Sequence, residues 1–261
     1  MAAASSRWAE ALHAWAIPRE ILAKAPESPW GFPPELFAAP EVPASTPSRK
    51  RALGALPPGG SVLDVGVGAG AASLGLVPPA ARLVGVDESA DMLVRFTAAS
   101  ARLGVAVRTV RTRWPEAAGE AGRADVVVCH HVLYNVADLV PFVRALTSSA
   151  RRRVVVELTA EHPQSALSPL WLHFHGLERP TGPSADDAVE VLEEVGIQPD
   201  VERFTGSSRL AEVDRRDLVA FARRRLCLPS DRDPEVDSLL PVNAAFPGRE
   251  LVCLWWSPPR A

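Results

Sequence analysis

The stretch that most constrains the fold runs from Val62 to Gly70, where a short apolar strand leads directly into three alternating glycines. Glycine allows the backbone to approach a ligand more closely than any side chain would permit. A second apolar run, Leu83 to Asp87, follows and ends in a carboxylate. A strand, a glycine loop, a helix and a second strand ending in an acid predict a nucleoside-binding βαβ unit. The nucleoside itself is not identified by this pattern.

The rest of the chain alternates between strand and helix patterns. Apolar runs predict further strands at 105–110, 125–129, 153–158, 201–204 and 251–256. Amphipathic stretches and capping residues predict helices at 48–56, 90–103, 138–148, 184–196 and 215–226. Alternation of this kind is typical of a doubly wound α/β fold, here a mostly parallel seven-stranded sheet with helices on both faces.

The ends of the α/β region set the expected domain boundaries. Residues 1–47 combine a helical pattern with a segment rich in proline and aromatic residues, which predicts an N-terminal cap or arm laid on the main domain. Residues 48–261 form the main domain. Two segments stand outside its regular alternation: 159–183, which follows the fifth strand, and the helical segment 206–248 between the last two strands.

Composition narrows the range of partners. A net charge of −3 gives no general attraction to nucleic acid or to anionic membranes. No segment reaches the roughly 18 consecutive apolar residues of a membrane helix, and charged side chains make residues 1–15 a poor signal peptide. The three cysteines, Cys129, Cys227 and Cys253, lack the spacing of a metal site or a disulfide framework. We expect a cytoplasmic protein without a bound metal.

Two features argue against a dinucleotide, although residues 66–71 also fit the glycine pattern of dehydrogenases. Asp64 interrupts the apolar strand, and a buried carboxylate is costly unless a cationic or hydrogen-bonding group lies nearby. An ammonium group would stabilise it, whereas a pyrophosphate would be repelled. The single tyrosine, Tyr134, is followed four residues later by Asp138 rather than by the lysine of a Tyr-x-x-x-Lys pair.

The segment from Asp64 to Gly70 resembles motif I of the class I S-adenosylmethionine-dependent methyltransferases, Asp/Glu-x-Gly-x-Gly-x-Gly. Residues 86–93, 124–133 and 153–157 are similar to the second, fourth and fifth strands of that family. The resemblance covers about residues 49–158 well and the last third of the chain only in the order of its elements. It does not extend to residues 1–47.

The resemblance implies a set of cofactor-binding residues. Asp64 would serve the methionine ammonium group, the three glycines would contact the amino-acid and ribose portions, and Asp87 would accept both ribose hydroxyls. After the third strand, residues 111–116 depart from the acidic pattern of many members. Either a backbone amide and Trp114 contact the adenine, or the correspondence with the family is shifted here by a few residues. The implied cofactor-binding residues are Asp64, Gly66, Gly68, Gly70, Asp87, Glu88, Trp114 and His130.

The candidates for acid–base chemistry follow the fourth and fifth strands, because open α/β sheets bind ligands at the carboxyl ends of their strands. They are His130, His131, Glu157 and His162. A base is needed only if the acceptor must lose a proton. His173 and His175 lie two residues apart on a predicted helix and are therefore poor joint metal ligands. The arginine runs 151–153 and 223–225 are interpreted as solvated faces rather than nucleic-acid contacts.

These observations favour a methyltransferase that acts on oxygen, nitrogen or carbon of a small molecule, with 159–183 on the acceptor side. One alternative is an RNA or protein methyltransferase, although the chain has no Asn/Asp-Pro-Pro-Tyr/Phe motif after the fourth strand. Another is a non-catalytic protein that binds the same cofactor. A third is a nicotinamide-dependent oxidoreductase. The oligomeric state is left open by the sequence.

Overall fold

The computed structural model describes residues 2–30, 45–206, 213–240 and 249–259, and within these ranges seven strands form one sheet. Their order is β3-β2-β1-β4-β5-β7-β6. β7 runs antiparallel to β5 and β6, and the other pairings are parallel. The predicted α/β fold with a mostly parallel sheet is therefore confirmed. The strands are β1 Ser61–Val65, β2 Arg82–Val86, β3 Ala106–Val110, β4 Ala124–His130, β5 Ala150–Thr159, β6 Asp200–Gly206 and β7 Arg249–Trp256.

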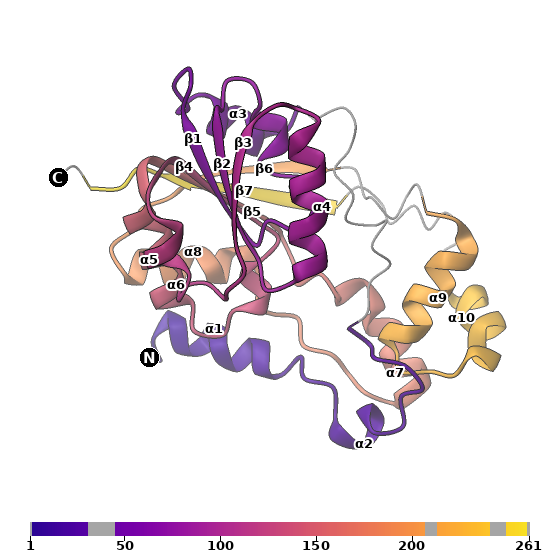
Figure 1. Cartoon of the computed structure of the whole chain (residues 1–261). Coiled ribbons are helices and arrows are strands. Elements are labelled where there is room, and N and C mark those ends of the chain that lie inside the picture. Colours follow the sequence, from indigo (N-terminus) through magenta and orange to yellow (C-terminus); the bar gives the residue numbers. More distant parts are fainter. Residues whose placement is uncertain (1, 31–44, 207–212, 241–248, 260–261) are drawn as a thin grey trace.

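Helices cover both faces of the sheet (Figure 1). One face packs against α1, α5, α6 and α8, and the other packs against α3 and α4. The helices are α1 Ala4–His13, α2 Arg19–Leu22, α3 Pro47–Leu53, α4 Ala90–Ala101, α5 Ala118–Ala121, α6 Leu139–Ser149, α7 Ser168–His175, α8 Ala185–Glu194, α9 Arg215–Arg225 and α10 Asp233–Leu239.

The alternation of side chains along the central strands builds the two cores. Leu63 and Val127 face the α6 side, whereas their neighbours Val62 and Val126 face the α4 side, and all four are fully buried. Burial on both faces explains why these strands are continuous apolar runs. The same alternation places Asp64, at the end of β1, on the α4 side of the sheet.

The connection between β1 and β2 differs from the expected helix. It contains only the short 3-10 helix Leu74–Leu76 within a series of turns. Pro78 and Pro79 explain the difference, because a proline inside a helix removes a backbone donor and clashes with the preceding turn. The glycine loop is therefore supported by a compact, turn-rich connection instead of by a long helix.

The N-terminal helix α1 packs on the face formed by α6 and α8. Trp8 in α1 is fully buried, donates from Nε1 to the carbonyl of Val136 at 2.8 Å, and stacks on Tyr134. Ser5 bonds Glu194 at the end of α8 through both its backbone nitrogen and its hydroxyl. Most of the predicted Pro/aromatic-rich arm, residues 31–44, lies outside the described residues.

A small helical unit accompanies the sheet domain. Its core joins α2, α7, α9 and α10 through apolar side chains that include Trp171, Val219, Leu226 and Val236. Figure 1 shows these four helices gathered beside one another, away from the sheet. α9 confirms the helix predicted at 215–226, and α10 lies in the predicted helical segment 206–248, of which 207–212 and 241–248 are not described.

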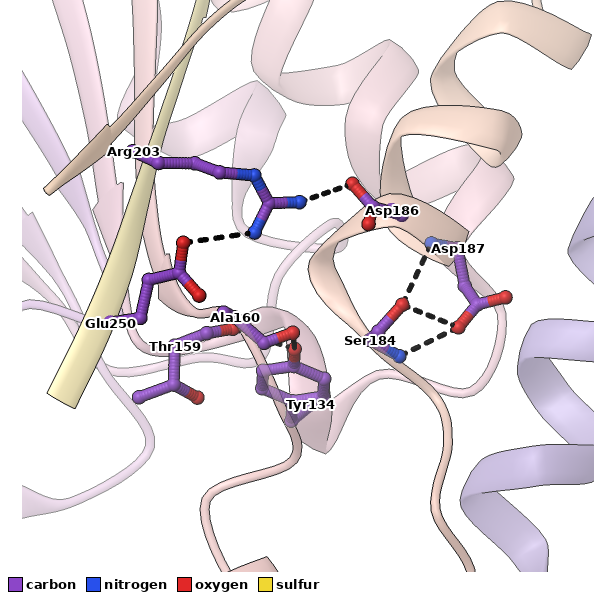
Figure 2. Close-up of polar contacts among 8 residues, drawn as sticks. All are labelled: Tyr134, Thr159, Ala160, Ser184, Asp186, Asp187, Arg203 and Glu250. Carbon is purple, nitrogen blue, oxygen red and sulfur yellow. Dashed lines mark hydrogen bonds and ion pairs between the residues drawn. The ribbon is translucent and has the colours of Figure 1, made fainter.

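α8 is attached to the sheet by polar contacts at its first turn (Figure 2). Ser184 and Asp187 form the capping box that their spacing predicts: the Ser184 nitrogen donates to Asp187 Oδ2 at 2.7 Å, and the Asp187 nitrogen donates to Ser184 Oγ at 3.3 Å. Arg203 of β6 bonds Asp186 at 2.5 Å and Glu250 of β7 at 3.5 Å. The start of α8 is therefore held to the antiparallel edge of the sheet.

The capping box gives a direct test of this attachment. We expect Ser184→Ala to lower the free energy of unfolding by about 1 kcal/mol, because the first turn loses its side-chain acceptor. The melting temperature should fall by about 2–4 °C, measured by circular dichroism. Ser148→Ala is the matched control, since Ser148 is exposed in the last turn of α6 and its hydroxyl bonds only the preceding turn. Equal melting temperatures for both variants would contradict the assigned role of Ser184.

Candidate functional site

The loop after β1 is fixed by backbone hydrogen bonds to the end of β2. The nitrogens of Gly66 and Val67 both donate to the carbonyl of Val86, at 2.9 and 3.0 Å. Gly66 has a φ of +71°, and a Cβ there would lie 2.4 Å from the Val132 side chain. Gly68 has a φ of +51°, yet a Cβ there would meet nothing within 4 Å. Gly66 is therefore required by packing, whereas Gly68 borders open space that a ligand can enter.

Asp87 lies half-buried at the end of β2, beside this open space. Its Oδ2 accepts from the nitrogen of Gly68 at 2.9 Å, and its Oδ1 accepts from the nitrogen of Ser89 at 2.9 Å. Ser89, not Asp87, caps α4, through its side chain and the nitrogen of Met92. A carboxylate offers about four acceptor positions, so Asp87 can still accept from ligand hydroxyls while it holds the loop.

Asp64 is a buried carboxylate at the end of β1, only 1% exposed. Burial raises its pKa to about 7; the negative charge of Asp87 adds to this, and the polar Ser73 offsets it in part. Its Oδ2 has no hydrogen-bond partner among the described residues. A cation next to Asp64 would stabilise the ionised form and satisfy that oxygen.

His131 and Glu157 come together at the carboxyl ends of β4 and β5. Nε2 of His131 lies 3.2 Å from Glu157 Oε1, and the His131 nitrogen donates to the Glu157 carbonyl at 2.7 Å. His131 has a φ of +59°, a conformation that is unfavourable for a residue with a side chain. The surrounding contacts thus hold His131 in a strained backbone conformation that turns its imidazole toward Glu157.

Glu157 is a buried anion, with 6% of its surface exposed. Burial alone would raise its pKa, but the facing charges of His130 and His131, together with Ser48, outweigh burial and lower it to about 2. Nδ1 of His130 lies 4.0 Å from Glu157 Oε1. Glu157 therefore stays ionised at neutral pH.

The structure places three other predicted site residues away from these groups. Trp114 is 6% exposed and packs in the α6-side core, where its Nε1 donates to the carbonyl of Phe142 at 3.2 Å. Glu88 is exposed and forms an ion pair with Arg113. His162 lies in a separate aromatic cluster. Neither Trp114 nor Glu88 presents a contact that links it to the glycine loop.

His162 is covered by the N-terminal segment. Its ring stacks on Trp15 at 3.9 Å between centroids and meets the edge of Tyr134. Burial, together with the charge of Arg179, lowers the pKa of His162 to about 4, which keeps the ring neutral. The Tyr134 hydroxyl is occupied by a hydrogen bond to the Thr159 carbonyl at 2.7 Å (Figure 2). These contacts indicate a packing role that joins the cap to the ends of β4 and β5.

No metal centre is formed by the described residues, which contain no group of three or more His, Cys, Asp or Glu side chains placed to hold an ion. His173 and His175 diverge as predicted: Nε2 of His173 lies 2.8 Å from Glu235, and Nε2 of His175 lies 2.7 Å from the Leu226 carbonyl. Within the same ranges, no helix has the length and apolar character needed to cross a bilayer.

Two serines lie at the site although no sequence pattern predicts them there. Ser48, the second residue of α3, is fully buried near Glu157, and Ser73 is fully buried near Asp64. Ser48 lies far in sequence from Glu157, and Ser73 is separated from Asp64 by the glycine loop. Only the packing of α3 and of the β1–β2 connection brings them there.

Comparison with known proteins agrees with this geometry. Residues 62–152 match a family model described as a methyltransferase domain. No curated protein matches the sequence. A putative methyltransferase from Bacillus halodurans is 15% identical, with 82% of this chain and 97% of that chain covered and a TM-score of 0.53. A cyclopropane-fatty-acyl-phospholipid synthase-like protein from Lactobacillus casei is also 15% identical, with 85% and 96% covered and a TM-score of 0.53.

The domain match spans β1 to the start of β5, and therefore includes the glycine loop, Asp87 and His131. The structural neighbours extend the likeness in fold over most of the chain. A domain of this class takes its methyl group from S-adenosylmethionine, which is the cofactor that the match implies. Residues 62–152 thus form a methyltransferase domain, and the chain has the fold of the class I S-adenosylmethionine-dependent methyltransferases.

Proposed function

We propose that this chain transfers the methyl group of S-adenosylmethionine to an oxygen or nitrogen atom of a small molecule. One observation carries the proposal: the glycine loop and the His131–Glu157 pair lie side by side. The Cβ position of Gly66 meets Val132, the residue directly after His131. A cofactor seated on the loop would thus lie next to an imidazole that is oriented by a buried carboxylate.

The residues of the loop fit the cofactor. Gly68 borders open space, so that the backbone can contact the amino-acid and ribose portions. Asp87 has acceptor capacity left for two ribose hydroxyls, and the unsatisfied Oδ2 of Asp64 suits the methionine ammonium group. Trp114 is occupied in the core, which leaves the adenine to backbone groups at the ends of β3 and β4.

The bound cofactor supplies an electrophilic methyl group, which leaves sulfur by in-line displacement. The protein must align the acceptor and, for a hydroxyl or a protonated amine, remove a proton. Nε2 of His131 faces Glu157, so Nδ1 is the nitrogen available to take that proton. The ionised Glu157 then stabilises the imidazolium. His130 is more buried and adds a second ring next to the same carboxylate.

The small-molecule acceptor follows from the surroundings of the site. The chain has a net charge of −3, and the carboxyl edge of the sheet carries Asp64, Asp87 and Glu157. An RNA backbone would be repelled by this set of carboxylates. A sarcosine dimethylglycine methyltransferase, a putative enzyme from Galdieria sulphuraria, shares the fold at 14% identity and a TM-score of 0.50. The substrate in the name of that enzyme is a small amine, a class compatible with this site.

Ribose recognition can be tested at Asp87. We expect Asp87→Asn to weaken S-adenosylhomocysteine binding at least about tenfold in calorimetry, because an amide replaces one acceptor oxygen with a donor. Glu88→Gln is the matched control, since Glu88 is the exposed neighbour and should change the affinity less than about twofold. Wild-type affinity in Asp87→Asn, in a protein that melts normally, would contradict the ribose assignment.

The raised pKa of Asp64 predicts a pH dependence of binding. In the unliganded protein Asp64 titrates near pH 7, whereas an ammonium group beside it would favour the ionised form. Binding should therefore release close to one proton at pH 6 and almost none at pH 8, and affinity should rise about tenfold across this range. Calorimetry in buffers of different ionisation enthalpy measures both quantities.

Asp64→Asn provides the comparison for that experiment. The variant cannot ionise at this position, so its proton release should vanish and its affinity should be nearly constant from pH 6 to 8. In the unliganded wild-type protein, ionisation of Asp64 lowers the free energy of unfolding as the pH rises from about 4 through 7. Asp64→Asn should not show this fall. Proton release that persists in Asp64→Asn would assign the titration to another group.

The role of His131 can be tested once a panel of phenols, alcohols and amines gives an acceptor. We expect His131→Ala to lower kcat about 100-fold or more, because the proton acceptor is lost, while S-adenosylhomocysteine affinity changes less than about threefold. Glu157→Gln should lower kcat in the same direction. His173→Ala, on α7, is the control. An unchanged kcat in His131→Ala would show that no base acts at this position.

A further inference from the structure

A pocket of about 430 Å³ lies at the opposite edge of the sheet from the glycine loop. It opens where the parallel strands begin: Ser61 and Arg82 are the first residues of β1 and β2, and Arg151 is the second residue of β5. The residues that matter for its chemistry are Ser61, Arg82, Val84, Arg108, Arg123 and Arg151. No part of the proposed methyl-transfer site contributes to it.

The strand register brings two of the arginines to the same side of the sheet. Arg82 of β2 pairs with Ala106 of β3, and Arg108 follows Ala106 by two residues. Side chains two residues apart on a strand share a face, so Arg82 and Arg108 project from neighbouring strands toward the α5 side. Arg123, just before β4, and Arg151 complete the ring of guanidinium groups around the pocket.

The positive charge of this pocket is only partly offset within the described part of the chain, where Asp125 attracts Arg151 as well as Arg152. None of its four arginines forms an ion pair there, and no acidic side chain lines the pocket. The nearest acid, Asp125, accepts from the nitrogen and hydroxyl of Ser61 at 2.9 and 2.7 Å and pairs with Arg152 at 3.7 Å. Four like charges around one concavity repel each other, and an anion between them would relieve the repulsion.

Two of the arginines are held in place by backbone carbonyls. Arg108 donates to the carbonyls of Glu120 and Ala121 at the end of α5, at 2.8 and 2.6 Å, and Arg123 donates to the carbonyl of Ala150 at 3.1 Å. These contacts fix the two guanidinium groups and leave further N–H donors on each.

The other two arginines have almost no structural role. Arg151 makes only a long contact of 3.5 Å to Ser61 Oγ. Arg82 is exposed and makes no side-chain hydrogen bond within the ranges described for this chain. The pocket therefore contains two guanidinium groups that are held by backbone carbonyls, Arg108 and Arg123, and two that can reorient toward a ligand, Arg82 and Arg151.

We propose that this pocket binds a small molecule that carries two or more phosphate groups. The planar guanidinium fork matches phosphate oxygens in pairs, and several arginines around one concavity suit a polyphosphate better than a single carboxylate. The volume of about 430 Å³ falls within the range of small-molecule pockets. Because the site lies at the far edge of the sheet, it is independent of the proposed methyl transfer.

The test uses inorganic tripolyphosphate as the probe and calorimetry on the full chain. We expect wild-type protein to bind it, and the double variant Arg82→Ala/Arg151→Ala to bind at least tenfold more weakly. The matched control is Arg95→Ala/Arg102→Ala, which removes two exposed arginines at α4 and leaves the pocket intact. Arg82→Lys/Arg151→Lys keeps the charge and should bind with intermediate affinity, because lysine cannot form the paired hydrogen bonds.

Several outcomes would overturn the proposal: no binding of tripolyphosphate to wild-type protein at millimolar concentration, equal loss in the control variant, or unchanged affinity in the double variant. Single-stranded RNA that binds more tightly than tripolyphosphate, with the same dependence on Arg82 and Arg151, would overturn it in favour of a nucleic-acid surface. Adenosine triphosphate distinguishes the source of the phosphates: tighter binding than tripolyphosphate indicates a nucleotide. S-adenosylhomocysteine affinity should be the same in all variants, which confirms that they are folded.

Discussion

The chemistry of the site depends on one backbone junction, the point at which the loop after β1 is tied to the end of β2. The carbonyl of Val86 accepts from two successive nitrogens of the loop, and the Asp87 carboxylate accepts from a third. These bonds fix the loop against the residue that we assign to the ribose. They also explain the glycines, because the chain can make this reversal only with left-handed residues, and a side chain at Gly66 would collide with Val132. The position of β4, and hence of His131, is linked to the same junction.

Three carboxylates at the carboxyl edge of the sheet are in different electrostatic states. Asp64 has a pKa near neutrality because it is buried without a countercharge. Glu157 is nearly as buried, yet its pKa is low because two imidazoles face it. Asp87 is half-buried and serves as an acceptor for backbone nitrogens. Similar side chains at one edge of the sheet thus stand in different environments, because their partners differ.

Much of this could be predicted from the sequence wherever the signal was local. The glycine loop, the acid that ends β2, the capping box of α8 and the strands of the sheet all follow from neighbouring residues. The helix expected between β1 and β2 was wrong because two consecutive prolines outweighed the general βαβ pattern. Trp114 was expected at the site from the resemblance to the family after the third strand, and His162 because it follows the fifth strand. Whether such a side chain faces the cleft or the core depends on distant partners, here Phe142 and Trp15, which no local pattern reveals.

The docking of α1 on α8 has a consequence for the order in which the molecule is assembled. Ser5 and Glu194, which are bonded in the folded protein, are separated by 189 positions along the chain. During translation Ser5 leaves the ribosome long before Glu194 is added to the chain. Trp8, which is fully buried in the folded protein, therefore stays exposed to solvent until α6 and α8 have been synthesised. The segment that covers the ends of β4 and β5 is therefore made well before the helices on which it packs.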